Sequence, residues 1–178
     1  MPGSNTRKRE KRRGMAQQKA RVLIRNQQNR IAINLRQIKQ MASRILNNLA
    51  LLNPEVSILL LDDPQITGLN RNYLQRNYPT DVLAFSMNGG PFTNTHPRVL
   101  GDVVISVETA QRQALKRKHP LCDEIAYLLI HGILHLLDYD HERSEKEDRR
   151  MRRMEKKIFQ KITEHSTVSA TSKKKTAR

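Results

Sequence analysis

Apolar residues recur along the chain with helical or strand periods, and these periods predict its elements. Between about Arg30 and Leu49 they repeat on one face of a helix, and Pro54 closes that segment. Three short apolar runs beside turn residues predict buried strands at residues 56–62, 82–86 and 100–106. Further helices are expected at about 63–73, at 107–118, from Pro120 onward, and after His141 to about Ile162. This order predicts an α+β fold: a single domain in which a small mixed β-sheet is packed with helices.

The positive charge of the chain is concentrated at its two ends. The 178 residues carry a net charge of +16, of which residues 1–30 hold +9 and residues 142–178 hold +7. We therefore expect a disordered basic N-terminal extension at 1–29, a folded domain at 30–162 and a basic C-terminal tail at 163–178. Basic arms on a neutral body favour binding to an anionic polymer by counterion release, although arms that only aid solubility would have the same composition. With 4% aromatic residues and no tryptophan, base stacking is not expected to be the main mode of any RNA contact.

The sequence lacks the usual features of secreted and membrane proteins. Cys122 is the single cysteine, which excludes an intrachain disulfide and favours a reducing compartment. No apolar run approaches the ~20 residues that a membrane span needs. The basic N-terminal stretch also lacks the apolar core of a secretory signal. These features predict a cytoplasmic protein with no membrane partner.

Three histidines give the most specific chemical signal, in the segment His131-Gly-Ile-Leu-His135-Leu-Leu-Asp-Tyr-Asp-His141. His131 and His135 are four residues apart, so on a helix they stand one turn apart on the same face. Two imidazoles at that spacing can reach one zinc ion at ~2.0–2.1 Å from each nitrogen. His141 can join them only if the chain turns after about Leu137. The spacing resembles that of zincin metalloproteases, where a third histidine follows a helix-breaking glycine.

Asp138 leaves a second ligand set open. In an unbroken helix, residues 131, 135 and 138 would share one face and offer two imidazoles and one carboxylate. A turn at Asp138 would instead place an aspartate in the left-handed conformation, at a cost of roughly 1 kcal/mol relative to glycine. A third interpretation, in which the histidines are only hydrogen-bonded in the core, fits a single histidine better than three at this spacing.

Gly132 distinguishes this motif from that of zinc peptidases. In H-E-x-x-H enzymes a glutamate occupies that position and is the general base that activates water. Without it, peptidase chemistry loses a proton acceptor that typically contributes ~10²–10⁴-fold in rate. A metal can still acidify a bound water and polarise a phosphoryl oxygen as a Lewis acid. Phosphodiester cleavage therefore suits the motif better than peptide hydrolysis.

The string HGILHLLDYDH resembles the signature H-G-x-L-H-L-x-G-Y-D-H of the YbeY family, the single-metal bacterial endoribonucleases of ribosomal RNA maturation. Family-like stretches also occur at 69–73, 79–85 and 100–106, so the resemblance covers roughly residues 35–162. It implies one Zn²⁺ held by His131, His135 and His141 on a zincin-like helix packed against a mixed sheet. It further implies cleavage of single-stranded RNA, processing of the 3′ end of small-subunit ribosomal RNA, and ribosome quality control. The implied partners are ribosomal RNA and the small ribosomal subunit, with ribosomal proteins as further candidates.

The chain departs from the family pattern at two positions. The turn glycine of the family is Asp138 here, and the arginine that follows the tyrosine of L-N-x-x-Y-R is Leu74. An arginine near the metal can neutralise charge that builds on a cleaved phosphate. Arg71 and Arg76 flank Leu74 and are the candidate catalytic residues, the alternative being that both are surface arginines without a role.

Two functions from different classes follow from these patterns. The first is a zinc-dependent endoribonuclease, a hydrolase of phosphodiester bonds, in ribosomal RNA maturation. The second is a zinc-stabilised assembly factor that binds RNA or ribosomal protein with little catalysis, an interpretation that the substitution at Leu74 keeps open. A zinc peptidase is a third possibility, and Gly132 argues against it.

Overall fold

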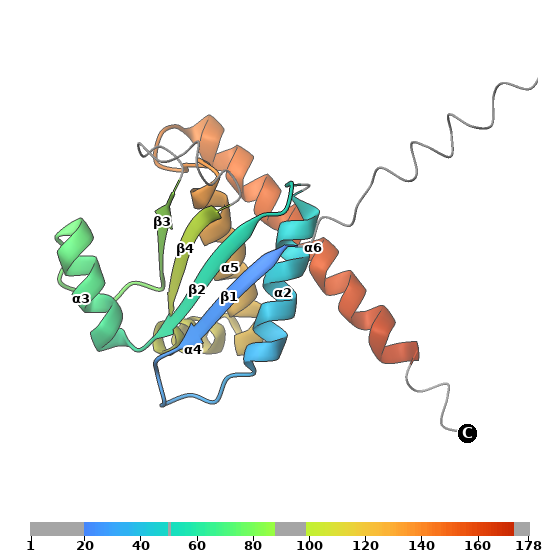
Figure 1. The fold of residues 1–178 in the computed structure, drawn as a ribbon, viewed down its shortest axis with the longest axis horizontal. Coiled ribbons are helices and arrows are strands. Elements are labelled where there is room, and N and C mark those ends of the chain that lie inside the picture. The colour runs from blue at the N-terminus through green and yellow to red at the C-terminus, as the bar shows by residue number, and fades with distance from the viewer. Residues whose placement is uncertain (1–19, 50, 88–98, 173–178) are drawn as a thin grey trace, which may run out of the picture.

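A four-stranded mixed sheet forms the centre of the molecule (Figure 1). The computed structural model describes residues 20–49, 51–87 and 99–172, with side chains as far as residue 163. In the order β1-β2-β4-β3, strands β1 and β2 are parallel, β2 and β4 are parallel, and β3 is antiparallel to β4. The strands are β1 (Arg21–Asn26), β2 (Glu55–Leu61), β3 (Val82–Ser86) and β4 (Val99–Ser106). The predicted α+β fold with a small mixed sheet is confirmed.

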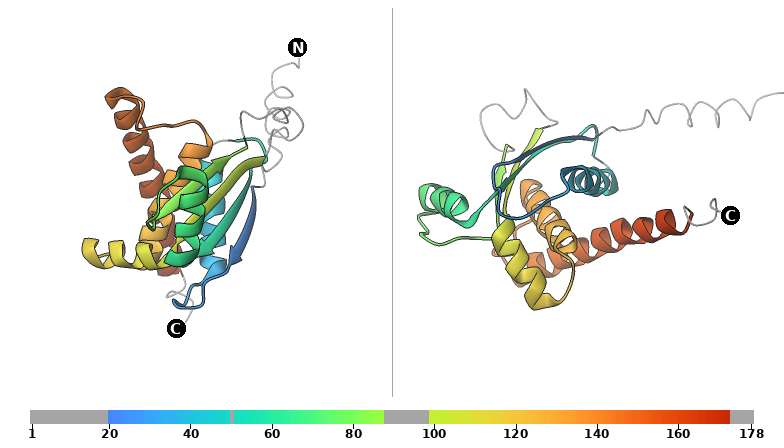
Figure 2. Two further views of the ribbon diagram at one scale, coloured as in Figure 1. Left: turned by 90° about the vertical axis from the view of Figure 1, so that its left-hand side faces the viewer. Right: turned by 90° about the horizontal axis from the view of Figure 1, so that it is seen from below.

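Helices cover the two faces of the sheet unequally (Figures 1 and 2). The main core lies between the sheet and helices α2 and α5, with α6 packed outside them. On the opposite face α3 covers a smaller cluster that includes Ile66 and Val104. The helices are α2 (Leu35–Asn48), α3 (Asp63–Leu74), α4 (Val107–Arg117), α5 (Leu121–Leu136) and α6 (Glu145–Ser172).

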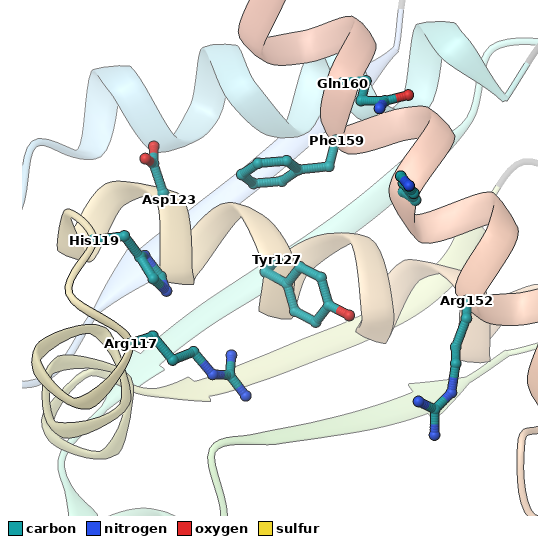
Figure 3. A pocket seen from close by; sticks show the side chains of 8 residues that line it. Arg117, His119, Asp123, Tyr127, Arg152, Phe159 and Gln160 are labelled. Atoms are coloured by element: carbon teal, nitrogen blue, oxygen red, sulfur yellow. The ribbon is translucent and has the colours of Figure 1, made fainter.

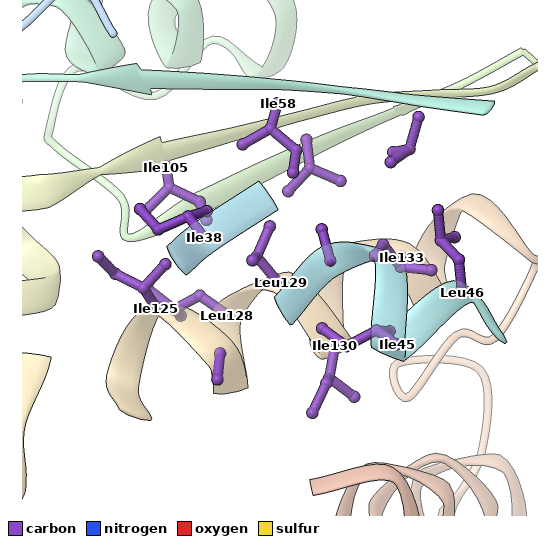
Figure 4. Close-up of a cluster of buried hydrophobic side chains, with 14 of the residues drawn as sticks. Ile38, Ile45, Leu46, Ile58, Ile105, Ile125, Leu128, Leu129, Ile130 and Ile133 are labelled. Carbon is purple, nitrogen blue, oxygen red and sulfur yellow. The ribbon is translucent and has the colours of Figure 1, made fainter. Parts of the chain in front are cut away.

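The alternation along β4 explains both clusters. Val103 and Ile105 point into the main core and Val104 points to the α3 side, because successive side chains of a strand face opposite ways. Figure 4 shows Ile105 and Ile58 of the sheet facing Leu129 of α5. Helix α5 is therefore fixed against the centre of the sheet.

Local sequence signals set the starts of α3 and α4. The carboxylate of Asp62 accepts from the backbone N–H of Gln65, and the Gln65 side chain accepts from the backbone N–H of Asp62, which completes a capping box. The hydroxyl of Ser106 accepts from the backbone N–H of Thr109 and caps α4 in the same way. The expected helix from Pro120 is confirmed, with Pro120 at its N-cap position.

The folded core begins earlier in the chain than the sequence suggested. Residues 21–26 fall within the stretch expected to be disordered, yet they form β1, which pairs with β2 in parallel from Arg21 opposite Glu55. Only Val22 of this edge strand is fully buried, so the strand has a weak apolar pattern. The strand is defined instead by its backbone hydrogen bonds to β2. Residues 1–19 of the predicted N-terminal extension lie outside the described residues.

The C-terminal helix is longer than expected. The sequence predicts that it ends near Ile162, but the backbone of α6 continues to Ser172. Among the side chains that the structure describes, which extend to residue 163, the buried stripe reaches Ile162. Residues 163–172 contain few apolar residues, so apolar periodicity gives no signal for the later turns. None of the helices in the described part of the chain combines the length and the apolar character needed to cross a lipid bilayer.

Candidate metal centre

Helix α5 carries the first two histidines and is apolar over most of its surface. Ten of its sixteen residues are buried, because the sheet, α2 and α6 all pack against it. His131 and His135 are the exceptions within the last two turns, since both are only half-buried. The four-residue spacing therefore places two imidazoles on the one face of α5 that the core does not use.

A tight turn ends α5 and brings the third histidine back. Asp138 has φ 63°, in the left-handed region. Its backbone N–H donates to the carbonyl of His135, and the N–H of Tyr139 donates to the carbonyl of Leu134. These two hydrogen bonds define a Schellman motif, which satisfies carbonyls at the helix end. The reversal after Leu137 that the sequence requires is confirmed.

The loop that follows is held by Asp140. Its carboxylate accepts from the backbone N–H of Glu142 at 2.9 Å and from Nε of Arg143 at 3.1 Å. The backbone hydrogen bond from Glu142 is the main reason why the pKa of Asp140 lies below its ordinary value, and Arg143 adds to it. The carboxylate is therefore ionised at neutral pH and fixes the segment that contains His141.

The three imidazoles converge as the turn predicts. The ring centroids of His131, His135 and His141 lie 4.6, 5.3 and 5.1 Å apart in pairs. One nitrogen from each ring lies within 4.8 Å of the others, so the set could hold a metal ion. Nε2 of His131 and Nε2 of His135 are 3.1 Å apart, close to the ~3.3 Å that tetrahedral zinc imposes on two imidazole nitrogens. In addition, Nδ1 of His141 is buried and has no hydrogen-bond partner among the described residues. These nitrogens fit a divalent metal.

The alternative ligand set with Asp138 requires an unbroken helix. Because α5 ends at Leu136 and Asp138 lies in the turn, residues 131, 135 and 138 do not share a helical face. The side chain of Asp138 is exposed, and the cluster found among the described residues contains three histidines and no carboxylate.

Glu155 of α6 supports the cluster, although the sequence did not single it out. Its carboxylate accepts from Nδ1 of His131 at 2.8 Å and from the hydroxyl of Tyr127 at 3.1 Å. Because an ionised carboxylate can only accept, Nδ1 of His131 carries the proton and Nε2 keeps its lone pair. Histidines that bind metals commonly donate their other ring N–H to a carboxylate in this way.

Glu155 is ionised despite its burial. It is 4% exposed, and this burial raises its pKa. The hydrogen bonds from His131 and Tyr127, with the electrostatic interactions of the His131 and His141 rings, lower the pKa by more, so that it lies below its ordinary value. A signal for this residue exists in the sequence. Glu155 interrupts a stripe of helical spacing whose other members, Met151, Ile158 and Ile162, are buried. The charged residues around it, however, give this segment the pattern of a solvated helix face.

The electrostatic environment keeps His135 neutral. Burial lowers the pKa of His135, and the neighbouring His131 and His141 lower it further. The imidazole therefore retains a free lone pair at neutral pH, which a metal ligand needs.

Gly132 lies where α5 packs against β3 and β4. A Cβ at this position would lie 2.8 Å from Cγ1 of Val103. The position at which zinc peptidases carry their glutamate therefore faces the core and has no space for a side chain. This geometry excludes a general base there, in agreement with the interpretation of the motif.

A cavity of about 420 Å³ opens beside the histidines. Among the side chains that line it are Asp81, Tyr127, His131, His141 and Glu155, together with two cations, Arg117 and Arg152. The candidate catalytic residues Arg71 and Arg76 are exposed residues at the end of α3 and just after it, and neither is among the described residues that line this cavity. Leu74 is also exposed. The cations at the cavity therefore come from α4 and α6, which the sequence did not indicate.

Fold and site together define a small α+β domain with a three-histidine site at the end of its central helix. Comparison with known proteins identifies the family. Residues 23–163 match the family model of the endoribonuclease YbeY. The chain is 43% identical to the endoribonuclease YbeY of Syntrophus aciditrophicus, over 78% of this chain and 87% of that protein. It is 44% identical to that of Syntrophotalea carbinolica, over 80% and 96%, and 40% identical to that of Aquifex aeolicus, over 82% and 94%.

The chain belongs to the endoribonuclease YbeY family, as its sequence resemblance predicted. A solution structure of the protein TM1509 from Thermotoga maritima has the same fold, with a TM-score of 0.60 at 23% identity over 83% of this chain and 93% of that one.

Proposed function

We propose that this chain is a metal-dependent endoribonuclease that cleaves single-stranded RNA in ribosomal RNA maturation, with one zinc ion held by His131, His135 and His141. The convergence of the three imidazoles on one point carries the proposal. Membership of the endoribonuclease YbeY family supports the reaction and favours it over the alternative, an assembly factor with little catalysis.

The residues around the three histidines orient the imidazoles for metal binding. When bound, a zinc ion supplies Lewis acidity that polarises a phosphoryl oxygen and acidifies a water molecule. Glu155 holds the proton of His131 on Nδ1, and Tyr127 holds Glu155 in turn. Imidazole ligands suit zinc, although they also accept other divalent transition metals.

The adjoining cavity holds two arginines beside the carboxylates of Asp81, Asp148 and Glu155. Arg117 and Arg152 line it beside His131 and His141, where their guanidinium groups can bind phosphate oxygens. Arg71 and Arg76 lie outside the lining of this cavity. We therefore expect them to contact RNA only where the strand extends beyond the cavity. The small ribosomal subunit as the partner, and a cytoplasmic location, are part of this proposal and are supported by the family resemblance alone.

A labelled single-stranded RNA that reproduces the 3′ end of small-subunit ribosomal RNA tests the activity directly. Protein loaded with zinc, manganese or no metal is incubated with the probe, and products are resolved on a denaturing gel. We expect cleavage by the zinc-loaded protein and loss of cleavage in His135→Ala, with RNA binding retained. The control is His165→Ala, which removes an imidazole from the expected C-terminal tail.

Two outcomes would contradict the proposal. Cleavage that survives His135→Ala would come from a contaminating nuclease. Binding without cleavage by fully metal-loaded protein would favour the assembly factor. Faster cleavage with manganese than with zinc would support the endoribonuclease activity and would show that manganese, not zinc, is the preferred metal.

A further inference from the structure

A second cavity, of about 690 Å³, lies next to the one at the histidines. It lies between α5 and α6, beyond the end of α4, and Figure 3 shows the side chains that line it. Arg117, Tyr127 and Arg152 line both cavities, so the two meet at these three side chains. A ligand that extends away from the histidines can therefore enter the second cavity.

Two of the few aromatic side chains of the protein line this second cavity. Tyr127 of α5 and Phe159 of α6 have ring centroids 6.3 Å apart and an interplanar angle of 65°. Phe159 packs on the main core, and the hydroxyl of Tyr127 donates to Glu155, so both rings are fixed in place. Tyr127 is nevertheless 37% exposed, so part of its ring is open to a ligand. Rigid, partly exposed rings are the surfaces on which bases of single-stranded RNA stack.

Cations surround the rings on the side toward the histidines. Nη1 of Arg117 lies 2.6 Å from Oε1 of the buried Glu124, and its guanidinium carbon lies 5.9 Å from the ring centroid of Tyr127. Arg152 is held by Asp148, with Nε 2.9 Å from its carboxylate. One contact fixes each guanidinium and leaves further N–H groups for a phosphate. Within the described part of the chain, no acidic side chain lies within ion-pair distance of Lys156.

Charged groups of both signs line the cavity. Arg117, His119 and Asp123 lie toward one end, and Arg152 lies at the opposite end (Figure 3). Phosphates are attracted to Arg117, Arg152 and Lys156, whereas a base edge can donate hydrogen bonds to Asp123 or exchange them with Gln160.

We propose that this cavity is a nucleotide subsite, in which one base of single-stranded RNA lies against Tyr127 and Phe159 while adjoining phosphates contact Arg117, Arg152 and Lys156. The subsite rests on the proposed function, because it extends the substrate path from the histidines. Its volume lies within the ~300–1,000 Å³ of typical ligand pockets. A base in a duplex is stacked within the helix and cannot enter, so the subsite selects unpaired RNA.

The first test separates the base from the backbone. An oligonucleotide of eight uridines is compared with an abasic ribose-phosphate chain of equal length and charge, by stopped-flow fluorescence anisotropy on the metal-loaded protein. We expect the wild type to bind the uridine chain about tenfold more tightly, the size of one stacked base. Phe159→Leu should abolish most of that difference, and Phe159→Tyr should keep it. If the wild type and a folded Phe159→Leu variant prefer the uridine chain over the abasic chain by the same factor, the subsite is contradicted.

The second test concerns the phosphates. Lys156→Gln is compared with Lys157→Gln, which removes the same charge from the next residue of α6, outside the lining of the cavity. We expect Lys156→Gln to lower the slope of log affinity against log salt by about 0.7, the effect of one phosphate on a single strand, and Lys157→Gln to leave it near the wild-type value. Equal slopes for the two variants would contradict a phosphate contact at Lys156.

The outcome of these tests is independent of the cleavage reaction, since both measure binding. Tighter binding of the uridine chain than of the abasic chain, without cleavage, would support the subsite and contradict the proposed endoribonuclease activity. Cleavage by a protein that shows no base preference would refute the subsite alone.

Discussion

Nδ1 of His131 donates a hydrogen bond of 2.8 Å to Glu155, a residue 24 positions later in the chain. This contact joins α5 to α6 at the histidine cluster and fixes which nitrogen of His131 faces His135 and His141. Helix α6 therefore contributes to the site through a carboxylate that does not itself belong to the cluster.

Replacing Glu155 should weaken metal binding. We expect Glu155→Gln to raise the dissociation constant for zinc about tenfold, because losing a carboxylate behind a ligating histidine typically costs 10–100-fold. Competition with a chromogenic chelator measures this constant without reference to activity. Glu147→Gln, which removes a carboxylate paired with Arg150 on the same helix, is the control. Unchanged zinc affinity in Glu155→Gln would mean that the hydrogen bond does not support the ligand.

The left-handed backbone at Asp138 should make the protein more stable with glycine there. Asp138→Gly removes the strain of a Cβ at φ 63°, and we expect the free energy of unfolding of the metal-free protein to rise by roughly 1 kcal/mol. Urea denaturation gives this value. Zinc stoichiometry should remain one per chain in Asp138→Gly and in Asp138→Ala but fall in His141→Ala, and metal loss in Asp138→Ala would show that the aspartate is a ligand.

Two glycines on helices should respond in opposite ways to alanine. In Gly132→Ala the new Cβ meets Val103, and overpacking of this kind typically costs about 1–3 kcal/mol. Gly68 lies within α3, where a Cβ would meet nothing within 4 Å, so Gly68→Ala should gain about 0.5–1 kcal/mol from helix propensity. Thermal or urea denaturation of both variants tests the pair. A neutral Gly132→Ala would show that α5 can move away from the sheet.

Asp63 should contribute to the pH dependence of stability. Burial raises the pKa of Asp63, but hydrogen bonds from Arg112, Ser106 and Thr109 lower it by more. Because the folded pKa lies below the unfolded value of 3.8, the stabilisation is fully present above pH ~4 and is lost as the pH falls through the folded pKa.

The variant Asp63→Asn isolates this contribution. It should lower the free energy of unfolding by roughly 1–3 kcal/mol at pH 7 and show a smaller difference from the wild type in acid. Urea denaturation between pH 2.5 and 7 measures both. Asp62→Asn should be nearly neutral, because asparagine caps a helix as well as aspartate does. A constant difference between Asp63→Asn and the wild type across this range would contradict the role of the charge.

The sequence alone determined the elements with strong local signals. The apolar periods of α2 and α5 act within a few positions of the chain, so their patterns are visible without the fold. The histidine cluster belongs to this group only in part. Helical spacing places His131 and His135 on one face, whereas the reversal at Asp138 that brings His141 to them was one of two alternatives that the sequence left open.

Only the tertiary structure decided the features that depend on residues distant in sequence. Strand β1 has a weak apolar pattern and is defined by its hydrogen bonds to β2. Glu155 resembles its charged neighbours until α6 packs on α5 and buries it beside His131. Arg117 and Arg152 likewise come together from α4 and α6 at one cavity. Local periodicity records which face of an element is buried, whereas the partner of a polar side chain is set by long-range packing.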